Sequence, residues 1–297
     1  MAGRISTSEI FNRAQANVAD AREREALTSE KAATGREIVR PSQDPAGFLR
    51  SNMIKDEMAS ITTTLRNAAA ATKVLGITEN VFAQVQETLQ RGSELAVSTA
   101  GYGDLKRSAS IAEVQGLYDS TIQLLNTRFG DRTLLAGFKS DQPAFSTDGR
   151  YLGDNGEIQV EIAQGLTLPL NVSGARAVLG QGITDGVNIL EPLQNLLLGL
   201  KEDDSELIRG SLEKFTRANN QISLIRSELG ARTLQAEHAI TQQNTQQVQG
   251  GETLASIAEV DAIKVFSDLA RDQTILRAAI STTQKLLSEN PSDIFYK

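Results

Sequence analysis

The sequence predicts a mainly α-helical protein: a long antiparallel helical bundle with terminal coiled-coil helices and a small β-rich insertion domain. Long stretches of the 297-residue chain carry apolar residues at helical spacing. One central stretch instead alternates apolar and polar residues, as strands do. Apolar residues, 40% of the chain, are mostly Ala, Leu, Ile and Val, whereas aromatic residues make up 4% and Trp is absent. This composition suits narrow helix–helix seams better than an aromatic ligand pocket.

Each end of the chain, residues 5–40 and 252–290, predicts a long amphipathic helix with a thin apolar seam. The seam residues recur at heptad a and d spacing, so they share one helix face. A seam this thin does not hold a lone helix in water, because nucleation is costly and most helical stability comes from packing. We therefore expect the ends to pair with each other, with other subunits, or both. The residues expected to make this coiled coil are Ile5, Phe11, Val18, Phe266, Leu269, Leu276, Ile280 and Leu287.

The first helical segment fades at Gly35, and a Pro-Ser-Gln-Asp-Pro segment at residues 41–45 separates it from the second helix. Pro41 ends a helix because it lacks an N–H and clashes with the preceding turn. Asp44 suits the N-cap, and Pro45 suits the first helical position, where the missing N–H costs nothing. The apolar spacing then predicts a helix to about Thr99, roughly 80 Å long at 1.5 Å per residue.

A third helix is predicted from Asp104 to about Arg128, and the composition changes after Gly130. Gly, Pro, Asp and Asn become frequent, and Asn155-Gly156 is a strong hairpin-turn signal. Short alternating runs predict strands around Ile158, Val160 and Ile162 and around Leu166, Leu168 and Leu170.

Helical spacing returns weakly over residues 186–200 and strongly over 203–249, before Gly250-Gly251 predicts a break. The expected organisation is a terminal coiled-coil domain (residues 1–43 and 251–297), a helical rod domain (44–130 and 181–250) and a small β domain (131–180). The long helices that leave residue 45 and arrive at residue 250 must run antiparallel if both ends leave the rod together.

The charge and the cysteine count exclude several classes of function. A net charge of −7 and a pI near 5.0 argue against nucleic acid as a partner, which needs clustered Lys and Arg. The absence of Cys excludes disulfides, thiolate metal sites and cysteine catalysis. No apolar run reaches the ~20 residues of a membrane helix, so no membrane insertion is expected. Residues 1–30 lack the apolar stretch of a cleaved signal peptide.

The residue patterns give little support for a site of chemical activity. We therefore expect no catalytic, cofactor or metal site, and we expect that the protein is not an enzyme. The single histidine, His238, has no ligand partners at helical spacing. The glycine-rich residues 180–186 lack the βαβ context of a dinucleotide site. Asp148, Asp154, Asn155 and Glu157 do not fit a calcium loop and are typical turn residues. An enzymatic role of the β insertion rests on this acidic cluster alone.

Several motifs together resemble the flagellin-like axial proteins of the bacterial flagellum. Near the start these are Arg-Ile-Ser-Thr at 4–7, Ala-Thr-Gly-Arg-Glu-Ile at 33–38, and the segment with Pro41, Ser42, Asp44 and Pro45. Residues 135–137 and 143–145 are similar to the entry to the β domain of such a protein, and residues 151–156 and 171–174 to that domain itself. Residues 256–262 resemble the shared entry to the terminal helix. Within this superfamily, the Pro-Ser-x-Asp-Pro form is similar to the hook–filament junction family.

This resemblance implies a structural adaptor that joins the flagellar hook to the filament as a ring of subunits. It implies export through the flagellar type III apparatus without a cleaved signal, to an extracellular site. The implied partners are other copies of the chain, a hook-associated protein on the hook side, flagellin on the filament side, and a cytoplasmic export chaperone on the C-terminal helix. It further implies terminal helices that are largely disordered in the monomer and order on assembly. A short filament-forming flagellin is the alternative, against which the segment at 41–45 and the small insertion speak.

Overall fold

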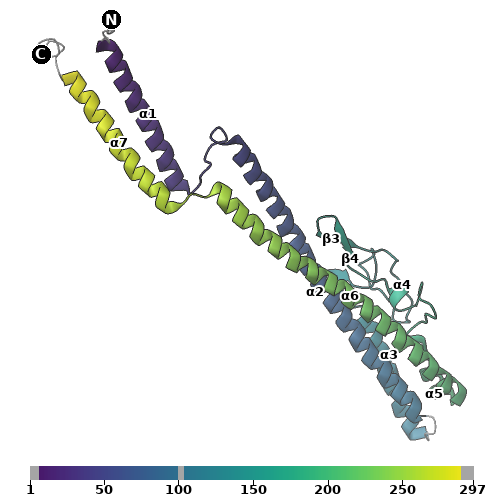
Figure 1. The fold of residues 1–297 in the computed structure, drawn as a ribbon. Helices are drawn as coiled ribbons and strands as arrows, with labels where there is room; N and C mark the ends of the chain where they lie inside the picture. Colours follow the sequence, from purple (N-terminus) through teal and green to yellow (C-terminus); the bar gives the residue numbers. More distant parts are fainter. Residues whose placement is uncertain (1–6, 100–103, 289–297) are drawn as a thin grey trace, which may run out of the picture. The chain divides into compact units, whose positions relative to one another are not determined.

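A computed structural model describes residues 7–99 and 104–288, which form seven helices and two small sheets (Figure 1). The helices are α1 (Thr7–Thr34), α2 (Pro45–Thr99), α3 (Asp104–Leu125), α4 (Gly174–Ala177), α5 (Glu191–Glu202), α6 (Ser205–Ala258) and α7 (Ala262–Ser288). The strands are β1 (Arg128–Phe129), β2 (Arg132–Thr133), β3 (Gln159–Ala163) and β4 (Leu166–Pro169). The chain divides into two compact units, Met1–Ala59 with Gln247–Lys297, and Ser60–Gln246. The predicted mainly α fold is confirmed.

In the unit Ser60–Gln246, α2 and α6 run antiparallel around a core with a heptad repeat. Their antiparallel course is plain from polar contacts at both ends, between Thr64 and Gln243 and between Gln86 and Ser223. The apolar faces of α2 and α6 pack against each other and are buried. The helices α3 and α5 contact each other and pack beside this pair. The fully buried residues of the repeat are Ala68, Leu75, Phe82 and Leu89 on α2 and Phe215, Ile222, Leu229 and Ala236 on α6.

The β insertion lies where the alternating pattern predicted strands, but its turn is elsewhere. β3 and β4 pair antiparallel, with Val160 opposite Leu168. The turn between them contains Gly165, whose φ of +73° suits glycine. The predicted turn at Asn155-Gly156 is wrong, because Asp154 accepts hydrogen bonds from Phe138 N and Gly156 N and holds this stretch as a loop.

Three polar side chains on α6 bind the backbone of the insertion. They are spaced eleven residues apart, which is close to three helical turns, so they share one face of the helix. Each donates a hydrogen bond to a main-chain carbonyl: Gln221 Nε2 to Ala177 O at 2.9 Å, Arg232 Nη1 to Asn171 O at 3.0 Å, and Gln243 Nε2 to Ile162 O. α6 is thus both a core helix and the support on which the insertion is held.

In the other unit, the break before the terminal helix lies later than predicted. α6 continues through Gly250 and Gly251 to Ala258, so the predicted break at these glycines is wrong. A side chain at Gly250 would lie 3.2 Å from Met58 Cγ, so glycine permits close packing of α2 here, which offsets its low helix propensity. The break follows Ala258 instead, where Asp261 Oδ1 accepts from Ile263 N at 2.9 Å and caps α7.

Candidate assembly interface

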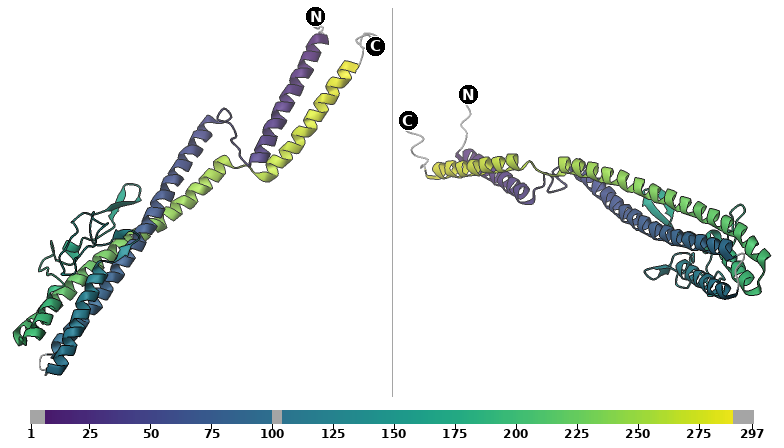
Figure 2. Two further views of the ribbon diagram at one scale, coloured as in Figure 1. Left: turned by 180° about the vertical axis from the view of Figure 1, so that it is seen from behind. Right: turned by 90° about the horizontal axis from the view of Figure 1, so that it is seen from below.

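α1 and α7 lie side by side and antiparallel (Figures 1 and 2). On α1, Ala21 is 2% exposed, and the inward face continues through half-buried residues at alternating spacings of four and three. These half-buried residues are Ala14, Val18, Glu25, Thr28 and Ala32. The spacing is that of heptad a and d positions, so these residues share one face of α1, which contacts α7.

On α7, the buried face is rotated from the face that the sequence predicted. Val265 is 7% exposed, whereas the neighbouring Phe266 is 58% exposed. Leu269, Leu276 and Ile280 are half-buried on the same side as Val265. Both Val265 and Phe266 fit an apolar repeat, and only the rotation of α7 against α1 decides between them. Of the other predicted residues, Phe11 lies on α1, Leu287 lies on α7, and Ile5 lies outside the described residues; the assembly role of all eight stays a prediction.

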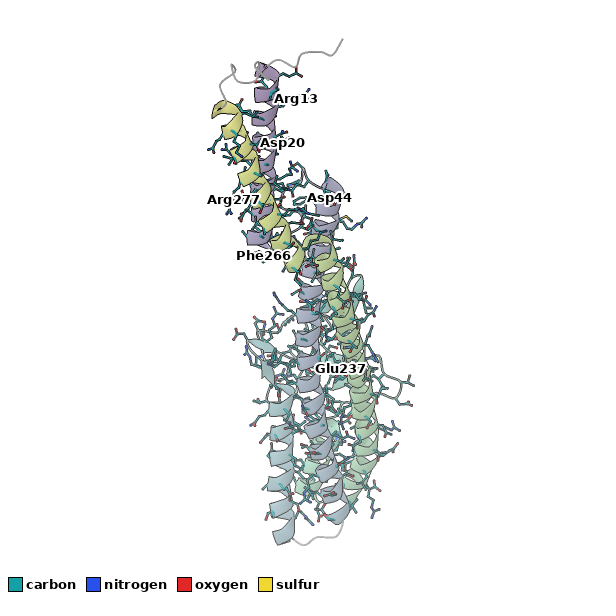
Figure 3. All side chains as sticks on the ribbon, turned by 60° about the vertical axis from the view of Figure 1, so that its left-hand side comes forward. Arg13, Asp20, Asp44, Glu237, Phe266 and Arg277 are labelled. Carbon is teal, nitrogen blue, oxygen red and sulfur yellow. The ribbon has the colours of Figure 1, made fainter. Side chains whose placement is uncertain are left out.

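The seam is not filled along its whole length. A groove of about 360 Å³ opens between α1 and α7, lined among others by Ala14 on α1 and Ala279 on α7. Two apolar residues of α7, Ile263 at 85% exposed and Phe266 at 58% exposed, lie outside the seam. Figure 3 labels Phe266 together with Arg277, another exposed residue of α7. The helix pair therefore leaves apolar surface available for contacts beyond the chain itself.

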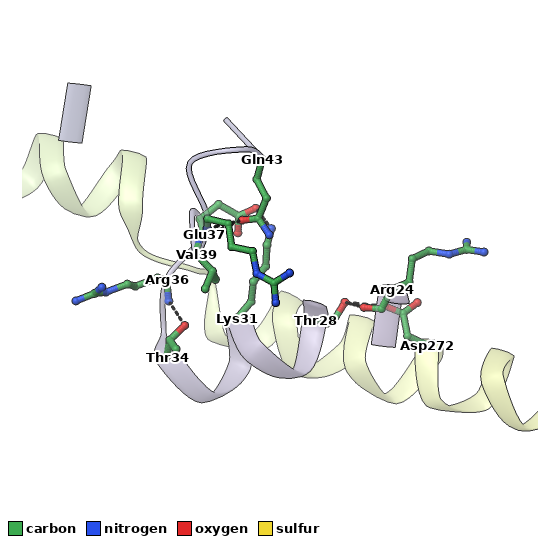
Figure 4. Close-up of polar contacts among 10 residues, drawn as sticks. Arg24, Thr28, Lys31, Thr34, Arg36, Glu37, Val39, Gln43 and Asp272 are labelled. Atoms are coloured by element: carbon green, nitrogen blue, oxygen red, sulfur yellow. Dashed lines mark hydrogen bonds and ion pairs between the residues drawn. The ribbon is translucent and has the colours of Figure 1, made fainter. Parts of the chain in front are cut away.

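One polar pair interrupts the apolar seam between α1 and α7 (Figure 4). The Thr28 hydroxyl lies 2.8 Å from Asp272 Oδ2 and also 3.0 Å from Arg24 O in its own helix. Asp272 is only 9% exposed, more buried than the half-buried Glu25 on the same seam. A carboxylate held this far from water needs hydrogen-bond partners to offset its desolvation, and Thr28 supplies one of them.

The two connections between the terminal helices and the long helices are joined to each other. Glu37 N donates to Ala258 O at 2.8 Å, and Val260 N donates to Gly35 O at 3.2 Å. These bonds enclose one antiparallel bridge, between Arg36 and Glu259. Two exposed ion pairs brace the first connection, Lys31 with Glu37 at 2.5 Å and Arg40 with Glu30 at 2.8 Å. These bonds thus hold the connection after α1 against the connection before α7.

The predicted motif at residues 41–45 builds the start of α2. Asp44 Oδ1 accepts from Gly47 N at 2.9 Å, and Pro45 is the first helical residue, so the predicted cap is confirmed. Gln43 Oε1 accepts from Val39 N at 3.0 Å and Arg40 N at 3.2 Å and folds the preceding turn. Pro41 and Ser42 are exposed in that turn. The motif therefore has a local structural role, and its role in assembly stays a prediction.

The acidic residues of the insertion act within turns. Asp154 Oδ1 accepts from Phe138 N at 2.7 Å and Gly156 N at 2.9 Å, and these bonds lower the pKa of Asp154. The hydroxyl of Ser146 is the main cause of the lowered pKa of Asp148. Burial raises the pKa of Tyr151 to about 12, and its hydroxyl donates to Asp154 O at 2.6 Å.

Within residues 7–99 and 104–288 there is no group of three or more His, Cys, Asp or Glu side chains placed to hold a metal ion. His238 is exposed on α6. Among the helices of this described part, none combines the length and apolar character needed to cross a bilayer.

Comparison with known proteins points to the flagellum. Residues 5–140 match the profile described as the bacterial flagellin N-terminal helical region. Flagellar hook-associated protein 3 of Escherichia coli is 23% identical over 299 residues, which cover 93% of this chain and 94% of that protein. A flagellar hook-associated protein of Vibrio parahaemolyticus has a TM-score of 0.67 at 18% identity, over 73% of this chain and 100% of its own. The flagellar junction protein FlgL of Legionella pneumophila has a TM-score of 0.57 at 14% identity, over 71% of this chain and 100% of its own.

These findings confirm the resemblance predicted from the sequence motifs. The chain has the fold of the flagellar hook-associated proteins. The relatives are structural proteins of the flagellum rather than enzymes, as predicted for this chain.

Proposed function

We propose that this protein is a junction subunit that joins the flagellar hook to the filament. The observation that carries the proposal is similarity to hook-associated protein 3 over 93% of the chain, together with a helix pair that exposes apolar side chains. In a ring of subunits, Val18, Leu269, Leu276 and Ile280 hold α1 against α7, and the exposed Phe266 contacts neighbouring copies. The terminal domain, residues 1–43 and 251–297, gains order as the ring assembles, because its thin seam gains partners.

The proposed partners follow the order of assembly. An export chaperone covers α7 in the cytoplasm, and the chain leaves by the flagellar export apparatus. At its extracellular site, the helical rod, residues 44–130 and 181–250, contacts a hook-associated protein on the hook side and flagellin on the filament side. The β domain, residues 131–180, faces outward. The exposed Phe266 and Ile263 support this scheme, since no residue within 7–99 and 104–288 covers them.

Electron microscopy of flagella labelled with an antibody to this protein tests the proposal. Label confined to the point where hook meets filament is the expected result. Deletion of the gene should leave hooks without filaments and flagellin in the medium. Label along the whole filament would contradict the proposal and favour a short filament-forming flagellin, the alternative suggested by the matched flagellin N-terminal region.

A surface substitution tests whether α7 makes contacts outside the chain. Phe266→Asp should abolish filament attachment, because a charge at an exposed apolar site disrupts a partner contact without emptying the chain's own core. Ser267→Asp, the same charge at the next exposed position of α7, is the matched control and should retain motility. Full motility of Phe266→Asp would show that Phe266 is not an assembly residue.

A further inference from the structure

We infer that the hydrogen-bonded pair of Thr28 and Asp272 sets the register in which α1 and α7 associate and selects α1 as the partner of α7. The inference concerns pairing within the chain, so it does not depend on the proposed junction role. It begins from burial: Asp272 is 9% exposed, and the apolar residues Val265, Leu269, Leu276 and Ile280 lie on the same face of α7. An ionisable side chain in such a seam weakens every arrangement that fails to supply it with a hydrogen-bond donor.

Thr28 supplies that donor in one register. Its hydroxyl lies 2.8 Å from Asp272 Oδ2. If α7 slides by one heptad, Asp272 comes opposite either Ala21 or Gly35. Ala21 has no side-chain donor and is 2% exposed, so water does not replace Thr28 there. Gly35 lies beyond the end of α1. The apolar residues of the seam do not discriminate in this way, because small and aliphatic side chains pack in several registers.

Asp272 also acts against a wrong partner. In a parallel pair formed by α7 and a second copy of α7, each Asp272 would meet the same residue of the other copy. Two charged carboxylates facing each other in an apolar seam repel and have no proton to donate, so such a pair must first take up a proton. Pairing with α1 avoids this contact and supplies Thr28. A single buried polar position of this kind specifies register and partner in coiled coils at some expense of stability.

The nearby Asp268 provides a matched control on the same helix. It is one turn before Asp272, but its side chain is 32% exposed and forms a surface ion pair with Arg271 at 3.0 Å. Asp268 thus has the same chemistry at a position where water and Arg271 already satisfy it. Replacement of Asp268 should leave the register unchanged.

Disulfide trapping in the full chain tests the inference, since the chain has no Cys of its own. Ala21 lies one heptad before Thr28, and Ala279 one heptad after Asp272, so Ala21→Cys with Ala279→Cys reports the observed register. Ala14→Cys with Ala279→Cys reports the register slipped by one heptad. Disulfides require Cα atoms within about 7 Å. Under mild oxidation, the first pair should close at least about tenfold faster than the second, the ratio expected when one buried polar group loses its partner.

Substitution of Asp272 then separates register from stability. With Asp272→Leu, both pairs should close at similar rates, because the seam no longer distinguishes the two registers. With Asp272→Asn, which still accepts a hydrogen bond from Thr28, and with Asp268→Leu, the tenfold preference should remain. The inference is overturned if the slipped pair stays slow with Asp272→Leu, if Asp272→Leu abolishes both crosslinks, or if neither pair closes in the parent chain.

Discussion

Arg226 on α6 binds Glu79 on α2 with two of its guanidinium nitrogens, Nε at 2.9 Å and Nη2 at 2.6 Å from the same carboxylate oxygen. Its third nitrogen, Nη1, donates to Gln86 Oε1 at 2.7 Å, also on α2. The two long helices thus share a polar clamp beside their heptad core. Such a geometry fixes both side chains and makes the pair stronger than an ordinary surface ion pair.

Arg226→Met should lower the free energy of unfolding of the helical unit by about 1 kcal/mol, because a partly exposed pair with this geometry lies at the upper end of surface ion pairs. Chemical denaturation followed by circular dichroism measures the change. Arg217→Met removes an exposed pair with Glu213 in the same helix and should change stability by much less. An equal loss of unfolding free energy in the two variants would show that the contacts of Arg226 with Glu79 and Gln86 stabilise the protein no more than an ordinary surface ion pair.

Two glycines of α2 should respond in opposite ways to alanine. Gly76→Ala should stabilise the protein by up to about 1 kcal/mol, because nothing lies within 4 Å of the added Cβ and alanine favours helix. Gly92→Ala should destabilise it, because the added Cβ would lie 2.8 Å from the Phe215 ring and 2.9 Å from Leu193 Cδ2. Thermal unfolding of both variants checks the contrast. Stabilisation by Gly92→Ala would contradict the tight contact between α2 and α6.

Gln243→Leu should loosen the β insertion from α6. Gln243 is 3% exposed, donates to Ile162 O and accepts from the Thr64 hydroxyl. Its replacement leaves Ile162 O without this donor, whereas the Thr64 hydroxyl keeps acceptors in its own helix at Ser60 O and Ile61 O. The expected loss is about 1–3 kcal/mol. Hydrogen exchange at β3 and β4 should rise more than exchange in the core of α3 and α5. Gln242→Leu, an exposed neighbour, is the control and should leave exchange in the hairpin unchanged.

The lowered pKa of Asp154 predicts a pH-dependent contribution to stability. Backbone hydrogen bonds from Phe138 and Gly156 hold the carboxylate in its charged form. A folded pKa below the unfolded value of about 3.9 gives stability that is present above that value and is lost as the pH falls through the folded pKa. Asp154→Asn should therefore be less stable than the parent at pH 6, and the difference should shrink below about pH 4. Denaturation curves at pH 6 and pH 3 measure it, and a constant difference would contradict the role of the charge.

The sequence predicted most of the fold where local signals agree with the final packing. The start of α2 is an example, because a proline, a capping aspartate and a second proline act within a few residues, and both Asp44 and Pro45 have their predicted roles. The strands around Val160 and Leu168 followed from alternation alone. The predicted break at Gly250 failed, because α2 packs closely there and tertiary contact outweighs the low helix propensity of glycine.

The candidate assembly residues were predicted less completely. Heptad spacing identified the half-buried Val18 on α1, but on α7 it selected the exposed Phe266 and missed the buried Val265. Asp272 was missed because a polar residue does not count in an apolar pattern. Its position could have identified it, because Asp272 lies between Leu269 and Leu276 at the spacing of heptad a and d residues.

By itself, the sequence determined the helical class, the caps at Asp44 and Pro45, the alternating strands and the family resemblance, since these depend on residues close together in the chain. Only the tertiary structure decided which face of α7 meets α1, where α6 ends, and that Gln221, Arg232 and Gln243 hold the insertion. These features depend on contacts between segments as far apart as Thr28 and Asp272, and no local pattern encodes the rotation or register of such a contact.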